Sequence, residues 1–113
     1  MEGADALRSP DDVAEWFDAG LRILGLAWQR TRAAGGTDNP GPLTAEGRAL
    51  VKAFDAAGII HDTSHLADES FWQLMDLASG PMMCPNGLRP ACASSAWRGS
   101  ERVPPAGRTT PAR

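Results

Sequence analysis

The chain is poor in cysteine and in long apolar runs. Only Cys84 and Cys92 occur among its 113 residues. Two cysteines are too few for a disulfide framework, and their spacing matches no zinc knuckle, so we expect two reduced thiols. The longest apolar runs, such as Leu21 to Trp28, fall far short of the roughly 20 residues that a bilayer span needs. No signal-peptide pattern opens the chain, so the sequence predicts a cytoplasmic location and no membrane span.

Positive charge is scarce in the front of the chain. From Met1 to Cys84 there are 13 Asp and Glu against six Lys and Arg, whereas residues 85–113 hold five Arg and one Glu. An acidic front argues against a nucleic-acid partner. The basic tail lacks the aromatic interleaving and the basic helical face that nucleic-acid binders use, so we expect no nucleic acid among the partners.

Two common catalytic motifs are missing. Gly35-Gly36 lacks the lysine and the strand-to-helix context of a phosphate-binding loop. Ser64 is not flanked by glycines as the serine of a nucleophile elbow is. The sequence therefore favours neither a nucleotide-binding loop nor a serine hydrolase.

Helix and strand signals alternate over residues 1–84. Caps such as Thr44 and Asp68 and stops such as Gly58 and Gly80-Pro81 bound the helices, and short apolar runs follow the stops. We expect helices over 10–19, 45–57 and 69–79, strands over 21–28, 59–64 and 82–84, and a long loop over 29–42. Loops of that length usually carry function.

This order predicts an α/β fold with a parallel sheet and right-handed crossovers. A closed parallel barrel takes eight strands and typically about 250 residues. We therefore expect a partial parallel (β/α) barrel of about three βα units over residues 1–84. The chain resembles a slice of a larger barrel.

The pattern stops at residue 85. Residues 85–113 contain five prolines and only Leu88, Trp97 and Val103 as large apolar residues. Such a composition buries too little apolar surface to offset its ordering entropy, so we expect an irregular, disordered tail. Alanine, arginine, proline and glycine dominate out-of-frame translation of a GC-rich gene, and our hypothesis is a reading-frame shift near Cys84.

His65 lies just after the strand expected over 59–64. The C-terminal ends of barrel strands are where α/β barrels keep their chemistry. An imidazole at this position can ligate a metal, with Asp62 and Ser64 available to orient it. Spacing alone also allows a histidine that is merely hydrogen-bonded in a loop, and by itself it favours that interpretation.

Four ordered segments carry a resemblance to a known family. They are Met1 to Leu7, Gly25 to Trp28, Leu43-Thr44-Ala45-Glu46-Gly47-Arg48, and the run from Gly58-Ile59-Ile60-His61-Asp62-Thr63-Ser64-His65 to Ser79-Gly80-Pro81. Together they resemble the membrane (renal) dipeptidase family of metallopeptidases over residues 1 to about 84.

The resemblance implies an α/β (TIM-type) barrel that hydrolyses dipeptides at a pair of metal ions, usually zinc. Glu2 aligns with the glutamate that bridges both metals, and His65 aligns with one histidine ligand. Trp28 stands where the animal enzymes keep a substrate-contacting histidine. A packing role for this aromatic side chain is the alternative.

Departures from the family pattern limit what the chain is expected to do. The family's first ligands lie in an H-x-D strand upstream of the bridging glutamate and have no counterpart here. The family's S-H-S segment is replaced by Cys84-Pro85-Asn86-Gly87, and Asn86 is a poor zinc ligand. Two donors cannot hold a metal pair whose sites want about four each. We therefore expect a truncated, inactive dipeptidase homologue.

The other polar residues of the motif have open roles. His61 shares strand parity with Thr63 and His65, so it is either a further inward ligand or, as we favour, a packing or supporting residue. Asp62 is interpreted as an anchor for its neighbours rather than a general base. Asp55 is interpreted as a cap or a solvated charge on a helix face.

Two alternatives remain. One is a non-catalytic module that associates with itself or a partner through exposed strand edges. The other is a different metal-dependent amidohydrolase barrel, which the ordered dipeptidase-like segments disfavour.

Overall fold

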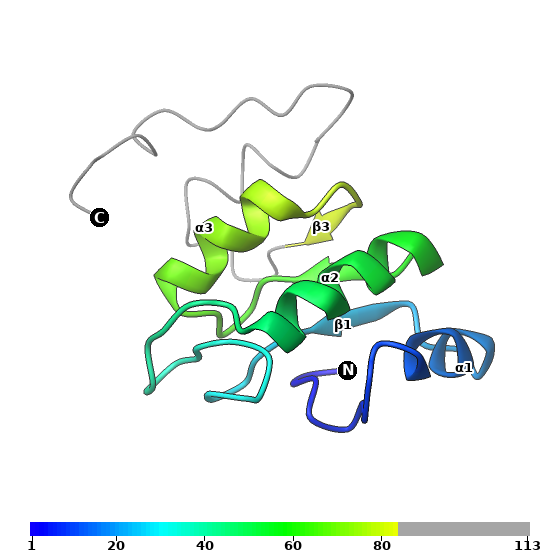
Figure 1. Ribbon diagram of the computed structural model, residues 1–113, viewed down its shortest axis with the longest axis horizontal. Helices are drawn as coiled ribbons and strands as arrows, with labels where there is room; N and C mark the ends of the chain where they lie inside the picture. The colour runs from blue at the N-terminus through cyan, green and yellow to red at the C-terminus, as the bar shows by residue number, and fades with distance from the viewer. Residues whose placement is uncertain (84–113) are drawn as a thin grey trace.

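Three helices and three short strands alternate along the chain in the computed structural model, which describes residues 1–83 (Figure 1). The order of elements is the one that the sequence predicts. In chain order they are α1 (Asp12–Asp18), β1 (Ile23–Gly25), α2 (Ala45–Ala57), β2 (Ile60–Asp62), α3 (Asp68–Leu77) and β3 (Met82–Met83). Cys84, expected to end the third strand, and the tail expected to be disordered lie outside the described residues.

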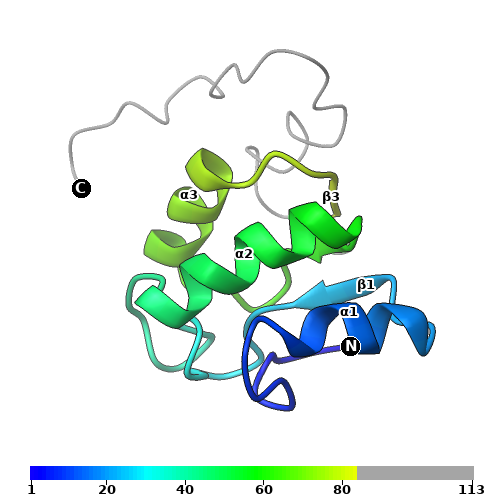
Figure 2. The same ribbon diagram turned by 45° about the vertical axis from the view of Figure 1, so that its right-hand side comes forward.

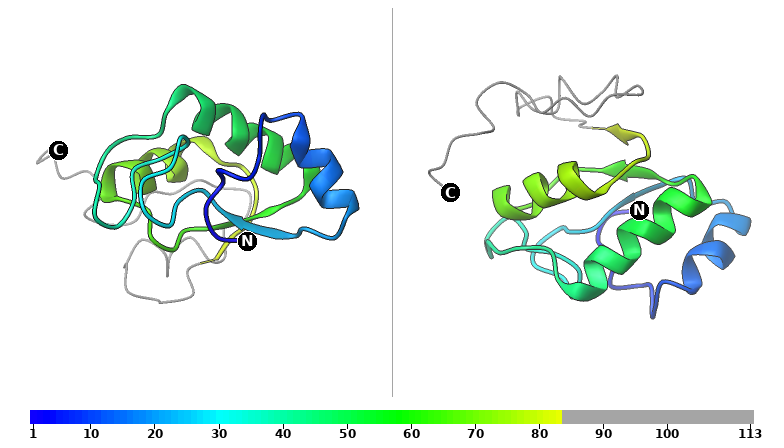
Figure 3. Two further views of the ribbon diagram at one scale, coloured as in Figure 1. Left: turned by 90° about the horizontal axis from the view of Figure 1, so that it is seen from below. Right: turned by 45° about the horizontal axis from the view of Figure 1, so that its top comes forward.

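The strands form one parallel sheet in the order β1-β2-β3. Leu24 pairs with His61, and His61 pairs in turn with Met82. The helices lie on one side of this sheet, with α2 between α1 and α3 (Figures 2 and 3). Sequential strand order with helices on one side is the arrangement of successive units in a (β/α) barrel, whereas a doubly wound sheet reverses its order and carries helices on both faces. The predicted fold class is confirmed for the described residues.

The helix boundaries follow from local chemistry, with one correction. The Thr44 hydroxyl accepts a hydrogen bond from Gly47 N at 3.0 Å and so caps α2, as predicted. Gly58 ends the same helix with a left-handed φ of 86°. Asp68 is the first residue of α3 rather than its cap, since Ala67 occupies that position and makes no side-chain cap.

The first strand is much shorter than the expected 21–28. After Gly25 the backbone stops pairing with β2, because Leu26 O accepts instead from Ala4 N and from the Thr31 hydroxyl. The chain therefore turns away from the sheet early. This turn starts the long loop over 29–42.

The first residues of the chain cover the outer edge of β1. The Met1 ammonium donates to Ile23 O at 2.9 Å, Gly25 N donates to Met1 O at 2.9 Å, and Gly3 N donates to Gly25 O at 3.0 Å. Glu2 forms a parallel bridge with Gly25. The outer edge of β1 is therefore not free, because residues 1–3 of the chain cover it, and association through exposed strand edges stays a prediction.

The core lies between the sheet and the helices. Its largest fully buried side chains include Leu24 of β1, Phe54 of α2 and Phe71 of α3. Burial of each such side chain contributes about 1.5–3 kcal/mol. Among the helices of residues 1–83, none has the length and apolar character needed to cross a membrane; the cytoplasmic location stays a prediction.

A close backbone approach explains one glycine of the motif. Gly47 lies in the first turns of α2, and a Cβ built on it would lie 2.0 Å from Ala33 O. Thr44 N also donates to Ala33 O at 2.9 Å, which keeps the loop against the helix. A side chain at position 47 would push the loop away.

We predict that Gly47→Ala destabilises the fold, although alanine is favoured over glycine in a helix interior by about 1 kcal/mol. The clash with backbone should outweigh that gain and cost about 1–3 kcal/mol net. Gly41→Ala is the matched control, because a Cβ there meets nothing within 4 Å. Urea unfolding measures both variants, and a Gly47→Ala chain as stable as wild type would contradict the packing argument.

Candidate metal site

The turn that follows β2 presents His65. Asp62 Oδ1 accepts from Ser64 N at 2.9 Å, and Leu66 N donates to Thr63 O at 3.5 Å. These bonds fold residues 63–66 into a tight turn, consistent with Asp62 acting as an anchor. His65 adopts a φ of 65°, the only positive φ among the described non-glycine residues. A left-handed conformation costs a residue with a Cβ about 1–2 kcal/mol.

Glu2 and His65 meet at the same end of the sheet. The Nε2 atom of His65 lies 2.9 Å from Oε1 of Glu2. The side chains are 34% and 52% exposed respectively, so solvent and small solutes reach both. Glu2 is held there by the pairing of residues 1–3 along β1, and His65 by the turn after the neighbouring strand. The structure therefore brings together the two residues that resemblance assigned to metal binding.

The His65 ring has two further neighbours. Thr37 Oγ1 lies 3.2 Å from Nδ1 of His65 and 3.2 Å from the carbonyl oxygen of Trp28. The Trp28 indole meets the imidazole edge-on, with 6.4 Å between the ring centroids, and is 55% exposed. Sequence reasoning missed Thr37, for which the only available signal was the length of its loop.

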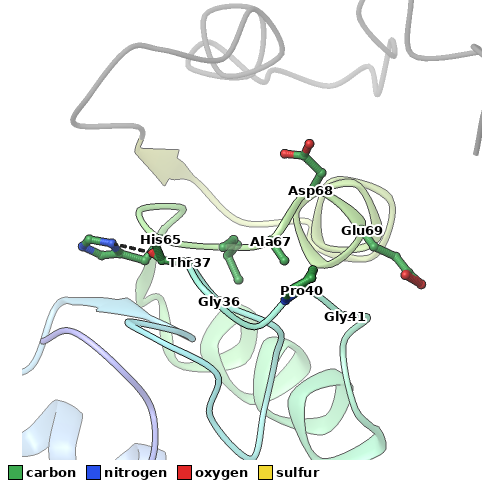
Figure 4. A pocket seen from close by; sticks show the side chains of 9 residues that line it. Gly36, Thr37, Pro40, Gly41, His65, Ala67, Asp68 and Glu69 are labelled. Atoms are coloured by element: carbon green, nitrogen blue, oxygen red, sulfur yellow. Dashed lines mark hydrogen bonds between the residues drawn. The ribbon is translucent and has the colours of Figure 1, made fainter.

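A hollow of about 450 Å³ opens beside these residues. Figure 4 shows Thr37 and His65 turned toward one another at one side of it. The loop before α2 and the start of α3 supply the remaining walls. The lining residues are Gly36, Thr37, Pro40, Gly41, His65, Leu66, Ala67, Asp68 and Glu69.

His61 does not join this group. It is 1% exposed, its ring packs against Phe54 at 5.6 Å between centroids, and its Nε2 lies 2.7 Å from Asp55 Oδ1. Its side chain therefore lies among the helices, which fits a packing residue rather than a further ligand. Strand parity linked it to His65 in the sequence, but β2 ends at Asp62 and the turn breaks the alternation.

Asp55 is a structural anchor rather than a solvated charge, so that interpretation is corrected. Its carboxylate accepts from Ser79 N at 2.8 Å, from the Ser79 hydroxyl at 3.0 Å and from Gly80 N at 2.9 Å, in addition to facing His61. Burial acts to raise the pKa of Asp55, but the hydrogen bonds from Ser79, His61 and Gly80 outweigh it and lower the pKa. A carboxylate in the last turn of a helix is unfavourable with respect to the helix dipole. The position of Asp55 near the end of α2 therefore indicated that it has hydrogen-bonding partners outside that helix.

The donor chemistry of Glu2 and His65 suits zinc, which takes carboxylate oxygen and imidazole nitrogen. The number of donors does not complete a site. Within residues 1–83 no group of three or more His, Cys, Asp or Glu is placed to hold a metal ion. The described residues thus fit one part of a metal centre, with both donors accessible.

The chain is similar in sequence and in structure to known proteins. Residues 1–95 match the sequence profile described as Membrane dipeptidase (Peptidase family M19). A curated relative, the uncharacterized protein in PQQ-III 3'region of Acinetobacter calcoaceticus, is 29% identical over 93 residues, covering 74% of this chain. The chain spans 30% of the length of that relative.

Solved structures show the same fold. A metallopeptidase from Rhodobacter sphaeroides, liganded with a phosphinate mimic of the dipeptide L-Ala-D-Ala, is 33% identical with a TM-score of 0.65 over 74% of this chain and 27% of that one. A dipeptidase AC, a metallopeptidase of family M19, is 34% identical with the same TM-score and coverage. An amidohydrolase from Pseudomonas aeruginosa is 20% identical, with a TM-score of 0.63 over 66% and 23%, and shares the fold.

We predict that Asp55→Asn lowers the free energy of unfolding at pH 7 by about 1–3 kcal/mol, because charge-assisted hydrogen bonds are lost. The folded-state pKa of Asp55 is lowered. Ionised Asp55 therefore stabilises the fold at pH values above the unfolded-state pKa of about 3.9. This stabilisation is lost as the pH falls through the folded-state pKa. Urea unfolding from pH 7 to pH 3 should show the two chains converging in acid, with Asp11→Asn as an exposed control. A constant difference across that range would refute the anchor.

We predict that His65→Gly is more stable than His65→Ala by about 1–2 kcal/mol, because only glycine adopts the left-handed conformation without strain. The matched pair at the neighbouring position, Ser64→Gly and Ser64→Ala, should show the opposite order, since Ser64 has no positive φ. Thermal or urea unfolding of the four variants measures this. If the glycine and alanine variants had the same order of stability at both positions, the turn would not be left-handed at His65.

Proposed function

The chain belongs to the membrane dipeptidase family, and we propose that its residues serve the metal-dependent hydrolysis of dipeptides. The observation that carries the proposal is the 2.9 Å approach of His65 Nε2 to Glu2 Oε1 at the C-terminal end of the sheet. Two metal-ligating groups of suitable chemistry, both accessible, meet where barrel enzymes keep their reacting groups.

The proposed roles combine the family resemblance with the contacts. Glu2 and His65 would hold the metal, Glu2 through its carboxylate and His65 through Nε2. When bound, the metal pair would supply Lewis-acid activation of a water molecule and of the peptide carbonyl. Trp28, exposed beside His65, would contact a side chain of the dipeptide. Asp62 acts through the turn by holding Ser64 N, which keeps His65 in place.

We further propose that this chain by itself does not hydrolyse dipeptides. A zinc site takes about four donors, and Glu2 and His65 supply one each. Activity would require donors beyond these two. Within residues 1–83 no third His, Cys, Asp or Glu lies close enough to Glu2 and His65 to complete a site.

We predict weak zinc binding centred on these two residues. Titration of ¹⁵N-labelled chain with zinc should shift the resonances of Glu2 and His65 first. His65→Ala or Glu2→Gln should weaken binding at least about tenfold, because losing even a partner that only orients a ligand typically costs that much. Asp11→Asn, which removes an exposed carboxylate at the start of α1, should leave the affinity unchanged. If zinc shifted other resonances but not those of Glu2 and His65, the proposed site would be wrong.

We predict no turnover of alanyl dipeptides, with either configuration at the second residue, when purified chain is assayed with added zinc. The assay follows released alanine over hours at zinc concentrations that saturate the weak site. Metal-dependent turnover abolished by His65→Ala would overturn the proposed inactivity while leaving the assignment of His65 intact.

A further inference from the structure

We propose that Thr37 is a positioning residue that fixes which nitrogen of the His65 ring is offered to the metal. The inference rests on the proposed function, because it assigns Thr37 a part in the same site. It goes beyond that function because Thr37 lies in the long loop and would itself contact neither metal nor substrate. Its action would pass entirely through the imidazole.

The reason lies in the single proton of the Thr37 hydroxyl, which has two neighbours. The Thr37 hydroxyl carries one proton and lies 3.2 Å from the carbonyl oxygen of Trp28, which can only accept. We assign the hydroxyl proton to that carbonyl. Toward His65 Nδ1, also at 3.2 Å, Thr37 then presents a lone pair, and in this assignment Nδ1 carries the hydrogen. The remaining nitrogen, Nε2, is the one that faces Glu2.

This arrangement serves two states of the site with one geometry. Without a metal, Nδ1 donates to Thr37 while Nε2 faces Glu2. A metal held at Nε2 would leave the bond from Nδ1 to Thr37 unchanged. A hydrogen bond at the far nitrogen is how metal-bound histidines are usually oriented and made more basic.

The loop that carries Thr37 is held firmly enough for this role. Gly36 N donates to Asn39 O at 2.9 Å and Asn39 N donates to Gly36 O at 3.2 Å, which closes Thr37 into a two-residue turn. A Cβ on Gly36 would lie 2.2 Å from the carbonyl carbon and oxygen of Gln29. The turn is therefore packed directly against the segment that follows Trp28.

Helix α3 anchors the same loop from the other side. The Ser70 hydroxyl, fully buried, accepts from Gly35 N at 3.1 Å and donates to Gly41 O at 2.7 Å. Ala67 N donates to Gly35 O at 3.1 Å. Both sides of the loop are thus tied to α3, and the Thr37 hydroxyl has little freedom to leave the His65 ring.

The first test reads the ring directly. The chain has only two histidines, so long-range ¹H–¹⁵N spectra of the imidazoles resolve both rings. Glu2→Ala is used as the background because the Glu2 carboxylate would otherwise compete for the ring proton. At about pH 8, where an ordinary imidazole is neutral, His65 should be the Nδ1–H tautomer. Adding Thr37→Val should convert it to the Nε2–H form that free imidazole favours, while Thr37→Ser should not.

The second test measures the consequence for zinc with Glu2 intact. Thr37→Val should weaken zinc binding about 10- to 100-fold, as loss of such an orienting partner typically does. Thr37→Ser should retain the wild-type affinity, and urea unfolding of each variant separates loss of fold from loss of orientation.

The outcomes separate the two proposals. An Nε2–H tautomer in the Glu2→Ala background with Thr37 present overturns the role of Thr37, whatever the stability of the valine variant. Thr37→Val that leaves the tautomer unchanged does the same. An Nδ1–H tautomer in a chain whose Glu2 and His65 do not respond to zinc supports the role of Thr37 and overturns the proposed function.

Discussion

The candidate site depends on backbone pairing between the first three residues and β1. Three hydrogen bonds of 2.9–3.0 Å join Met1 and Gly3 to Ile23 and Gly25. This register places the Glu2 side chain at the C-terminal end of the sheet, where the turn after β2 holds His65. Because side chains alternate along an extended strand, a slip of one residue would turn Glu2 to the other face. The same backbone pairing therefore covers the edge of β1 and places the carboxylate that we propose as a metal ligand.

The described residues divide their polar chemistry between two regions. Glu2, Thr37 and His65 cluster at the C-terminal ends of the strands, in accessible loops. Asp55 and His61 lie among the helices, where they tie α2 to β2 and to the segment before β3. Separation of a functional end from stabilising contacts elsewhere is characteristic of (β/α) barrels. It explains how two histidines only four positions apart in sequence have unrelated roles.

The sequence predicts the features that depend on local signals. The Thr44 cap, the Gly58 stop and the order of the elements follow from residues close together in the chain, and the association of Glu2 with His65 follows from family resemblance. Three features depend on tertiary contacts that no local pattern contains: the covered edge of β1, the partners of Asp55 and the placement of Thr37. The parity argument for His61 fails for a related reason, because β2 ends before the alternation reaches His65. The disordered tail and the frame-shift hypothesis stay predictions, since they fall on residues 84–113.

The energetics around His65 show a side chain that contributes little to the stability of the fold. Its left-handed backbone costs about 1–2 kcal/mol that glycine would not incur. Its contact with Glu2 is half-exposed, and exposed ion pairs contribute only about 0–1 kcal/mol. The neighbouring Trp28 leaves 55% of its surface in solvent instead of burying it. By contrast, His61 is fully packed and shares its carboxylate partner with two backbone N–H groups. A turn that accepts strain and weak pairing gains little in stability from the histidine, which agrees with the role proposed for His65 as a metal ligand.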